Sequence, residues 1–147
     1  ASDDLDDLHR MDTDLSVRRY INGKASSLDE TKKYLSENII SYRANGYGRY
    51  AIRDRFTNEF LGICGYLFEN YGVDFGYRFL PSCWGKGIAT EAARAVLKKG
   101  IPNHFREQVV GIVLPENKAS KTVLTKVGFK WKENLELLGF NVEKYTL

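Results

Sequence analysis

The sequence predicts an α+β domain in which helices flank a mixed, mostly antiparallel central sheet. Its 147 residues, 43% apolar and 28% charged, fit one compact domain over residues 1–147. The middle of the chain repeats apolar residues with the two-residue period of strands, while flanking segments carry helical spacing. A strand, a helix and another strand then follow one another, which favours a parallel pair within the sheet.

Two helices are expected in the first part of the chain. Residues 3–11 are acidic and place Leu5 and Leu8 on one side. Ser27 and Glu30 form a capping box, because each side chain can accept from the backbone N–H of the other residue. The helix that follows should run to about residue 43 and end at Asn45-Gly46. Its inward-facing residues should be Leu35, Ile39 and Tyr42.

The rest of the chain alternates strands with helices. Strands are expected at residues 50–55, 60–68, 73–80, 108–114, 129–131 and 140–145, and helices at residues 87–99 and 117–127. The first three strands should form an antiparallel meander. Phe75, Tyr77 and Phe79 share one face of the third strand and should fill the core.

Composition excludes several classes of protein. A net charge of +3 is too weak to indicate nucleic acid, and no apolar run approaches the ~20 residues of a membrane span. Cys64 and Cys83 give no disulfide framework, and neither they nor the isolated His9 and His104 indicate a metal site. We therefore expect a cytoplasmic protein with no metal, nucleic-acid partner or membrane partner. The chain is basic from residue 82 onward, which suits a polyphosphate ligand or reflects solvated lysines alone.

The strongest functional pattern is the loop Trp84-Gly85-Lys86-Gly87-Ile88-Ala89-Thr90, which joins a strand to a helix. Its two glycines remove Cβ atoms where a ligand must approach the backbone. The free N–H groups of the following helical turn, together with the helix dipole, form an anion site. Lys86 adds a charge and Thr90 a hydroxyl, so a diphosphate fits this arrangement.

Two known phosphate-binding patterns do not fit the loop. A P-loop requires Ser or Thr where Gly87 follows Lys86, and a glycine five residues before Gly85. A dinucleotide-binding fingerprint requires a third glycine where Thr90 stands. On the glycines alone, a tight turn without a ligand is an equally good interpretation.

The loop resembles the pyrophosphate loop of GNAT N-acetyltransferases, whose pattern is R/Q-x-x-G-x-G/A. Gly87 and Ala89 match the last two positions, and Trp84 replaces Arg or Gln. That replacement is typical of the branch of bacterial ribosomal-protein N-terminal (Rim-type) acetyltransferases. Residues 117–129 resemble that branch's N-x-x-S…L-x-K-x-G-F stretch, and residues 76–81 resemble its preceding strand. The resemblance covers residues 47–147.

The resemblance implies that acetyl-CoA is the co-substrate. The residues implied in binding it are Phe79, Leu80, Trp84, Gly85, Lys86, Gly87, Ile88, Ala89, Thr90, Asn117 and Ser120. The pantetheine arm would pair with the backbone of Phe79 and Leu80, between two splayed parallel strands. Asn117 would contact pantetheine amides and also cap its own helix.

One departure from the family concerns the edge of the sheet. The family usually opens with a strand before the acidic helix, and here the sequence begins at that helix. The usual first strand is therefore expected to be missing from the sheet. The resulting open edge should lower stability or pair with another chain, as in a homodimer.

The resemblance also implies direct attack of a neutral amine on the thioester. Leu124 replaces the family's usual tyrosine acid, and Ser120 is the candidate substitute, although it could equally be a small residue packed against the cofactor. Asp74 and Glu136 are candidate bases, with solvated surface as the alternative for each. A backbone N–H near Phe79 is the candidate oxyanion donor.

The expected function is N-acetylation of a primary amine, either on a protein N-terminus or on a small molecule. Because no usual acid is present, a non-catalytic acyl-CoA-binding module is the alternative. Residues 22–24 and 69–72 form the loops expected to select the acceptor.

Overall fold

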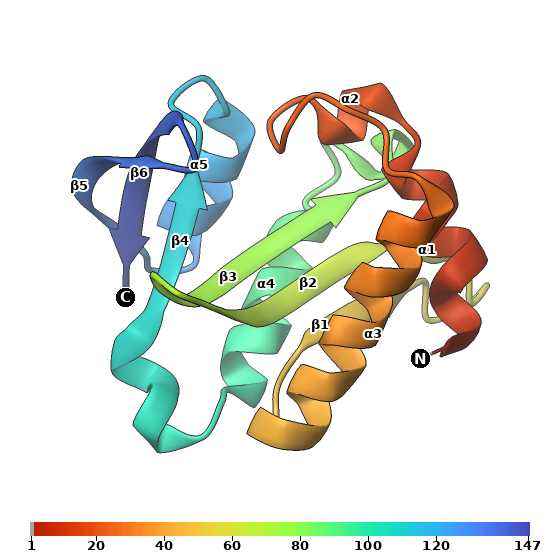
Figure 1. The fold of residues 1–147 in the computed structure, drawn as a ribbon, viewed down its shortest axis with the longest axis horizontal. Helices are drawn as coiled ribbons and strands as arrows, with labels where there is room; N and C mark the ends of the chain where they lie inside the picture. Colours follow the sequence, from red (N-terminus) through yellow and green to blue (C-terminus); the bar gives the residue numbers. More distant parts are fainter. Residues whose placement is uncertain (1) are drawn as a thin grey trace.

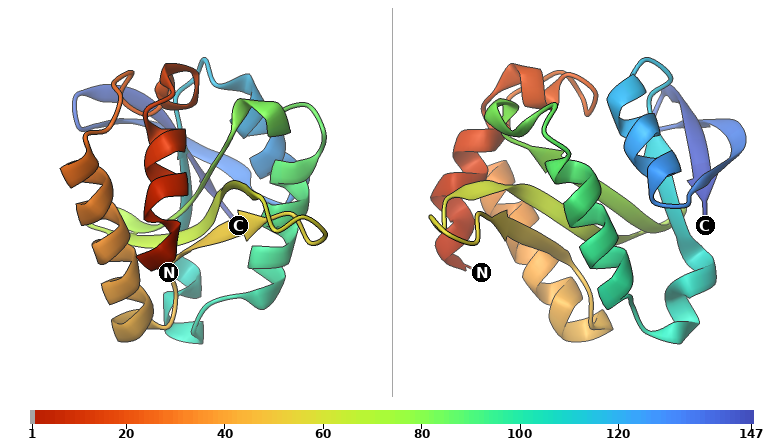
Figure 2. Two further views of the ribbon diagram at one scale, coloured as in Figure 1. Left: turned by 90° about the vertical axis from the view of Figure 1, so that its right-hand side faces the viewer. Right: turned by 180° about the vertical axis from the view of Figure 1, so that it is seen from behind.

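The computed structural model describes residues 2–147, which form a six-stranded sheet with helices on both faces (Figures 1 and 2). The strand order is β1-β2-β3-β4-β6-β5. The strands are β1 (Arg49–Arg53), β2 (Phe60–Glu69), β3 (Gly72–Phe79), β4 (Val109–Val113), β5 (Lys130–Leu137) and β6 (Phe140–Thr146). All neighbours pair antiparallel except β3 and β4, which confirms the predicted mixed sheet.

The helices form two layers around the sheet. Helices α1 (Leu5–Asp12) and α3 (Leu28–Asn45) cover one face, while α4 (Ile88–Lys99) and α5 (Lys118–Lys126) cover the other (Figure 2, right). The short α2 (Leu15–Arg18) lies beyond the end of β3. Three 3-10 helices, η1 (Ser2–Asp4), η2 (Pro81–Cys83) and η3 (Asn103–Gln108), complete the described chain. The sequence did not predict α2, because four residues are too few to show a period.

The parallel pair separates soon after it forms. β3 and β4 pair only at Val73 with Val109 and Asp74 with Val110. Beyond these positions the two strands diverge as a V that opens toward α2 (Figure 1). The fold therefore contains one place where the inner edge of a central strand has no strand partner.

The larger core lies between the sheet and the α4/α5 layer. Phe75 and Phe79 on β3 are buried there, as predicted, and Tyr77 packs against the same cluster. Phe75 stacks on Phe129, with ring centroids 5.4 Å apart. A smaller core between α1 and the sheet contains Leu8, Met11, Val17, Phe60 and Ile63.

The inner face of α3 matches the prediction in part: Leu35 packs against the smaller core and Ile39 is partly buried, but Tyr42 does not face inward. Tyr42 is 47% exposed, whereas the buried residues of the helix are Thr31, Asn38 and Ser41. The reason is that this helix faces polar groups: Asn38 Oδ1 accepts from the Arg49 N–H at 3.0 Å, and Ser41 donates to the Tyr47 carbonyl at 3.0 Å. The capping box at Ser27 and the left-handed Gly46 that ends α3 are confirmed.

β1 forms one edge of the sheet, and among residues 2–147 no strand pairs with its outer side. The expected open edge is therefore present in this part of the chain. Its effect on stability, or on pairing with a second chain, stays a prediction.

Candidate active site

A cavity of about 350 Å³ lies where β3 and β4 diverge. One wall is β3 from Phe75 to Phe79, and the opposite wall is the end of β4 with the first turns of α5. The far end is lined by α2 and the residues that follow it. An apolar cleft at a break in the strand pairing is a typical place for a ligand.

The backbone of β3 faces this cavity with unpaired groups. The Leu80 N–H donates to the Leu61 carbonyl on β2 at 2.9 Å. Because backbone groups alternate in direction along an antiparallel strand, those of Phe79 point away from β2 and into the V. The Phe79 carbonyl accepts from the Trp84 indole N–H at 3.0 Å. Trp84 therefore anchors the loop to β3, a contact that the sequence pattern did not reveal.

The glycine loop has the open backbone that the sequence predicted. Gly85 and Gly87 have φ of 73° and 76°, and a Cβ on either would meet no atom within 4 Å. The backbone bond from Glu91 N–H to the Gly87 carbonyl, at 3.0 Å, is the first of α4. The N–H groups of residues 88–90 precede it and have no acceptor within the helix. These donors and the exposed Lys86 make the loop electropositive, and the loop borders the cavity through Trp84 and Ala89.

Two hydroxyls, one from Tyr77 on β3 and one from Ser120 on α5, meet at the cavity. The Asn117 side chain caps α5 by accepting from the Ser120 N–H at 3.2 Å. The Tyr77 hydroxyl lies 2.9 Å from Ser120 Oγ and donates to the Ser120 carbonyl at 2.9 Å. Burial raises the pKa of Tyr77 well above its ordinary value, so the phenol stays protonated. Tyr77 is the residue that sequence reasoning missed, since it was assigned to the core alone.

Leu124 is buried in the position where the family's tyrosine was expected. A Cβ on Gly111 would lie 2.9 Å from Leu124 Cδ2, so the leucine packs directly on β4. The side chain of Leu124 therefore supplies close packing, and the nearby hydroxyl comes from Tyr77 on the other strand of the V.

Comparisons with known proteins agree with this geometry. Residues 1–130 match the family described as Acetyltransferase (GNAT) domain. The chain therefore belongs to the GNAT acetyltransferase family. It is an acetyl-CoA-dependent acyltransferase. The chain is also 32% identical over 126 residues to the uncharacterized protein YkkB of Bacillus subtilis, covering 83% of this chain and 73% of that protein.

Two solved structures share the fold of this GNAT domain. One is a spermidine N-acetyltransferase from Vibrio cholerae in complex with CoA and spermine, with a TM-score of 0.79 and 19% identity, covering 99% of this chain and 89% of that one. The other is a Salmonella typhimurium acetyltransferase that modifies the N-terminal serine of the 50S ribosomal subunit protein L7/L12. Its TM-score is 0.74, with 21% identity and coverage of 99% and 89%.

The two candidate bases of this GNAT domain lie outside the cavity lined by Ser120. Asp74 is buried behind β3, where its carboxylate accepts from Arg49 Nη2 at 3.1 Å and from the Tyr71 hydroxyl. It is therefore not solvated surface. Glu136 is exposed on β5 and borders a separate depression. The structure brings Ser120 and Asn117 together but neither carboxylate with them.

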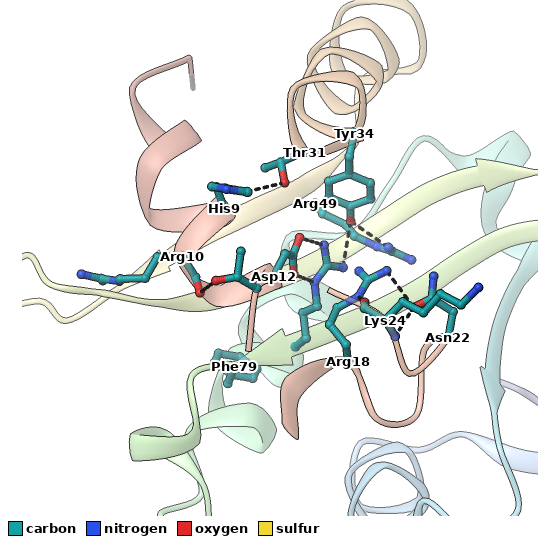
Figure 3. A network of polar contacts seen from close by, with 12 residues as sticks. His9, Arg10, Asp12, Arg18, Asn22, Lys24, Thr31, Tyr34, Arg49 and Phe79 are labelled. Carbon is teal, nitrogen blue, oxygen red and sulfur yellow. Dashed lines mark hydrogen bonds and ion pairs between the residues drawn. The ribbon is translucent and has the colours of Figure 1, made fainter. Parts of the chain in front are cut away.

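A buried polar network lies behind β3, on the α1/α3 side (Figure 3). Arg78 makes a two-pronged ion pair with Asp12, with both N–O distances at 2.7 Å. The Tyr34 hydroxyl accepts from Arg49 Nη1 at 2.8 Å and from Arg78 Nη1 at 3.4 Å. Burial alone would raise the pKa of Tyr34, but the two arginines outweigh burial and lower it. Arg78 connects this network to the cavity, because it also lines the cavity wall.

The described part of the chain contains no group of three or more His, Cys, Asp or Glu residues that could hold a metal ion. Within residues 2–147, no helix combines the length and apolar character that a membrane crossing requires. Cys64 and Cys83 are unpaired and buried, and burial raises the pKa of Cys64 to about 12.

Proposed function

We propose that this GNAT domain transfers an acetyl group from acetyl-CoA to a primary amine by direct attack on the thioester. The observation that carries the proposal is the cavity between β3 and β4, which has unpaired backbone on the β3 wall and a pair of hydroxyls, Tyr77 from β3 and Ser120 from α5, that joins the two walls. In the reaction an N–C bond forms and the C–S bond breaks. The amine loses a proton and the sulfur gains one.

The cofactor would extend along the V. Its diphosphate binds the N–H groups and Lys86 of the loop from Trp84 to Thr90. Its pantetheine arm lies beside β3, where the Phe79 N–H is directed into the gap and can donate to a pantetheine carbonyl or to the developing oxyanion. The Leu80 N–H is already bonded to the Leu61 carbonyl and the Leu80 carbonyl to the Cys83 N–H, so Leu80 contributes through its side chain. Asn117 offers its amide N–H₂ to the arm, since its oxygen caps α5.

Ser120 would donate a hydrogen bond to the departing thiolate, and Tyr77 would orient it. Tyr77 donates to the Ser120 carbonyl, which leaves the Ser120 O–H free to turn toward sulfur. The raised pKa of Tyr77 opposes full transfer of its own proton, so its role is to hold the serine. This role for Ser120 replaces the tyrosine that Leu124 displaces.

Asp74 remains our proposed acceptor for the proton of the amine. A Cβ on Gly76, which lines the cavity, would lie 3.2 Å from Asp74 Oδ1. The same Cβ would lie 2.5 Å from Arg49 Nη2, so both the carboxylate and the guanidinium that holds it lie directly behind this glycine. A proton could reach the carboxylate through one water molecule.

The acceptor amine belongs either to a protein N-terminus, as in the Rim-type branch, or to a small molecule. The fold neighbours that act on spermidine and on a ribosomal-protein N-terminal serine support an amine acceptor in general. Two unpaired thiols support our proposal that the protein acts in the reducing cytoplasm.

The test is a screen of peptide and small-molecule amines, with release of free thiol from acetyl-CoA as the readout. Steady release that depends on the amine supports the transferase. Tight binding of acetyl-CoA by calorimetry, with no thiol release for any amine, would instead support the binding module.

A further inference from the structure

The cavity continues past the proposed cofactor site to an end that has no role in cofactor binding. That end is formed by residues of α2 and the segment after it: Ser16, Val17, Arg19, Tyr20 and Ile21. If acetyl-CoA enters along the loop and α5, as proposed above, the acceptor amine must enter from this end. Its walls therefore select the acceptor, and the present inference rests on that proposed function.

The charges on these walls are of one sign. Arg19 and Arg78 line the cavity, and no Asp or Glu among the described residues does so. Arg78 is neutralised by Asp12 through two bonds of 2.7 Å. Arg19 is exposed and has no described carboxylate in ion-pair contact; its guanidinium lies 5.0 Å from the centre of the Tyr20 ring. Arg19 therefore offers its full donor fork to a ligand.

The neighbouring Arg18 lies near Arg78, although its side chain does not line the cavity (Figure 3). Its Nε donates to the Lys24 carbonyl at 3.0 Å and its Nη2 to Asn22 Oδ1 at 3.3 Å, so neutral oxygens hold it in place. Burial, followed by the charge of Arg78, lowers the pKa of Arg18. A partly buried cation beside a second cation gains stability when an anion approaches.

Two acids near these arginines, Asp14 and Glu30, each hold a helix N-terminus and do not line the cavity. Asp14 caps α2 by accepting from the Ser16 N–H at 2.9 Å, and Glu30 accepts from the Ser27 N–H at 2.7 Å. A second ammonium group on an acceptor, such as a polyamine carries, would therefore meet Arg19 with no wall carboxylate to balance it. A carboxylate would form a charge-assisted bond with Arg19, while Val17, Tyr20 and Ile21 offer apolar contact.

We infer that the acceptor is a primary amine that carries a carboxylate, bound by the guanidinium of Arg19. A free amino acid and the N-terminus of an acidic peptide both present this chemistry. Polyamines do not, so the acceptor differs in charge from the spermidine of the Vibrio cholerae fold neighbour.

The experiment measures kcat/KM by thiol release from acetyl-CoA with matched acceptors and the full chain. Phenylalanine is compared with phenylalaninamide, the peptide Ser-Asp-Asp-Phe-amide with Ser-Lys-Lys-Phe-amide, and spermidine completes the set. In at least one pair, kcat/KM for the carboxylated acceptor should exceed that for its neutral or basic partner by about 10- to 100-fold. The pair that shows this difference identifies the acceptor as a free amino acid or as an acidic peptide. Arg19→Gln should remove that preference and leave the carboxylate-free partner unchanged, and Arg19→Glu should reverse it.

Arg43→Gln is the control, since Arg43 is exposed at the far end of α3 and does not line the cavity. The inference would be overturned if spermidine had the highest kcat/KM, or if Arg19→Gln lowered kcat/KM equally for both members of every pair. Either result would leave amine acetylation itself intact. Absence of turnover with every amine would count against the proposed transferase as well as against this acceptor class.

Discussion

Replacing Ser120 with alanine isolates the proposed step at the sulfur. Ser120→Ala removes one hydroxyl from the cavity wall, and the structure shows that the change leaves no partner unsatisfied. The Tyr77 hydroxyl still donates its hydrogen bond to the carbonyl of residue 120, at 2.9 Å. The Asn117 cap is also retained, because it accepts from the backbone N–H of residue 120. Alanine also has the higher helix propensity. The free energy of unfolding should therefore change by less than about 0.5 kcal/mol.

The effect on turnover should be much larger. A hydrogen bond to a charged group contributes about 1.5–3 kcal/mol, and each 1.4 kcal/mol is tenfold. Because charge develops on sulfur only as the C–S bond breaks, the loss belongs to kcat. We expect kcat to fall about 10- to 100-fold, with the dissociation constant for coenzyme A changed less than about threefold.

The assay combines initial rates of thiol release, using the best amine found, with calorimetric binding of coenzyme A. Thr122→Ala is the matched control, because Thr122 lies on the same helix with its hydroxyl bonded to the Lys118 carbonyl at 3.0 Å on the exposed side. An unchanged kcat in Ser120→Ala, or an equal loss in Thr122→Ala, would show that the serine only packs against the cofactor.

Three further outcomes follow from the structure. Gly87→Trp should abolish coenzyme A binding in calorimetry, because the indole fills the open space in front of the loop. Gly139→Trp is the control, since Gly139 is an equally open left-handed position on the β5–β6 turn and binding should survive there. Equal losses of binding in the two variants would refute the loop assignment. Asp12→Ala should lower the free energy of unfolding by about 3–5 kcal/mol in urea, because Arg78 loses its buried partner. A smaller loss than in Asp7→Ala, which breaks a partly exposed ion pair with Arg53, would contradict this. The pKa of Tyr34 is lower in the folded state than in the unfolded chain, so ionisation of its phenol stabilises the folded state. This stabilisation is fully present above pH ~10, the ordinary pKa of tyrosine, and is lost as the pH falls through the lowered pKa of the folded state. The stability gap between wild type and Tyr34→Phe should therefore be wider at pH 10.5 than at pH 8, and a constant gap would refute it.

Local features of the fold were predicted well because they depend on neighbours within one turn. The Ser27 capping box, the left-handed Gly46 and the glycines of the loop all occur as expected. Their geometry is decided by backbone sterics and by hydrogen bonds between residues at most four positions apart.

The inner face of α3 was predicted only in part, because a rule for apolar burial was applied to a helix whose second half covers polar groups. Asn38 and Ser41 are buried because Arg49 and Tyr47 present backbone groups to them, and these partners follow the helix in the chain. Nothing in the spacing of residues 28–45 reveals what will lie against them.

The sequence by itself determined the order along the chain of the strands and of the four longer helices, the glycine loop at the start of α4 and the family. Tertiary structure alone decided that Tyr77 meets Ser120 across 43 positions, and that Arg78 meets Asp12 across 66. It also decided that Asp74 lies behind β3 rather than in the cavity. The physical reason is that periodicity and caps report interactions along the chain, whereas these contacts form only when the sheet brings distant segments together and burial leaves their polar groups no other partners.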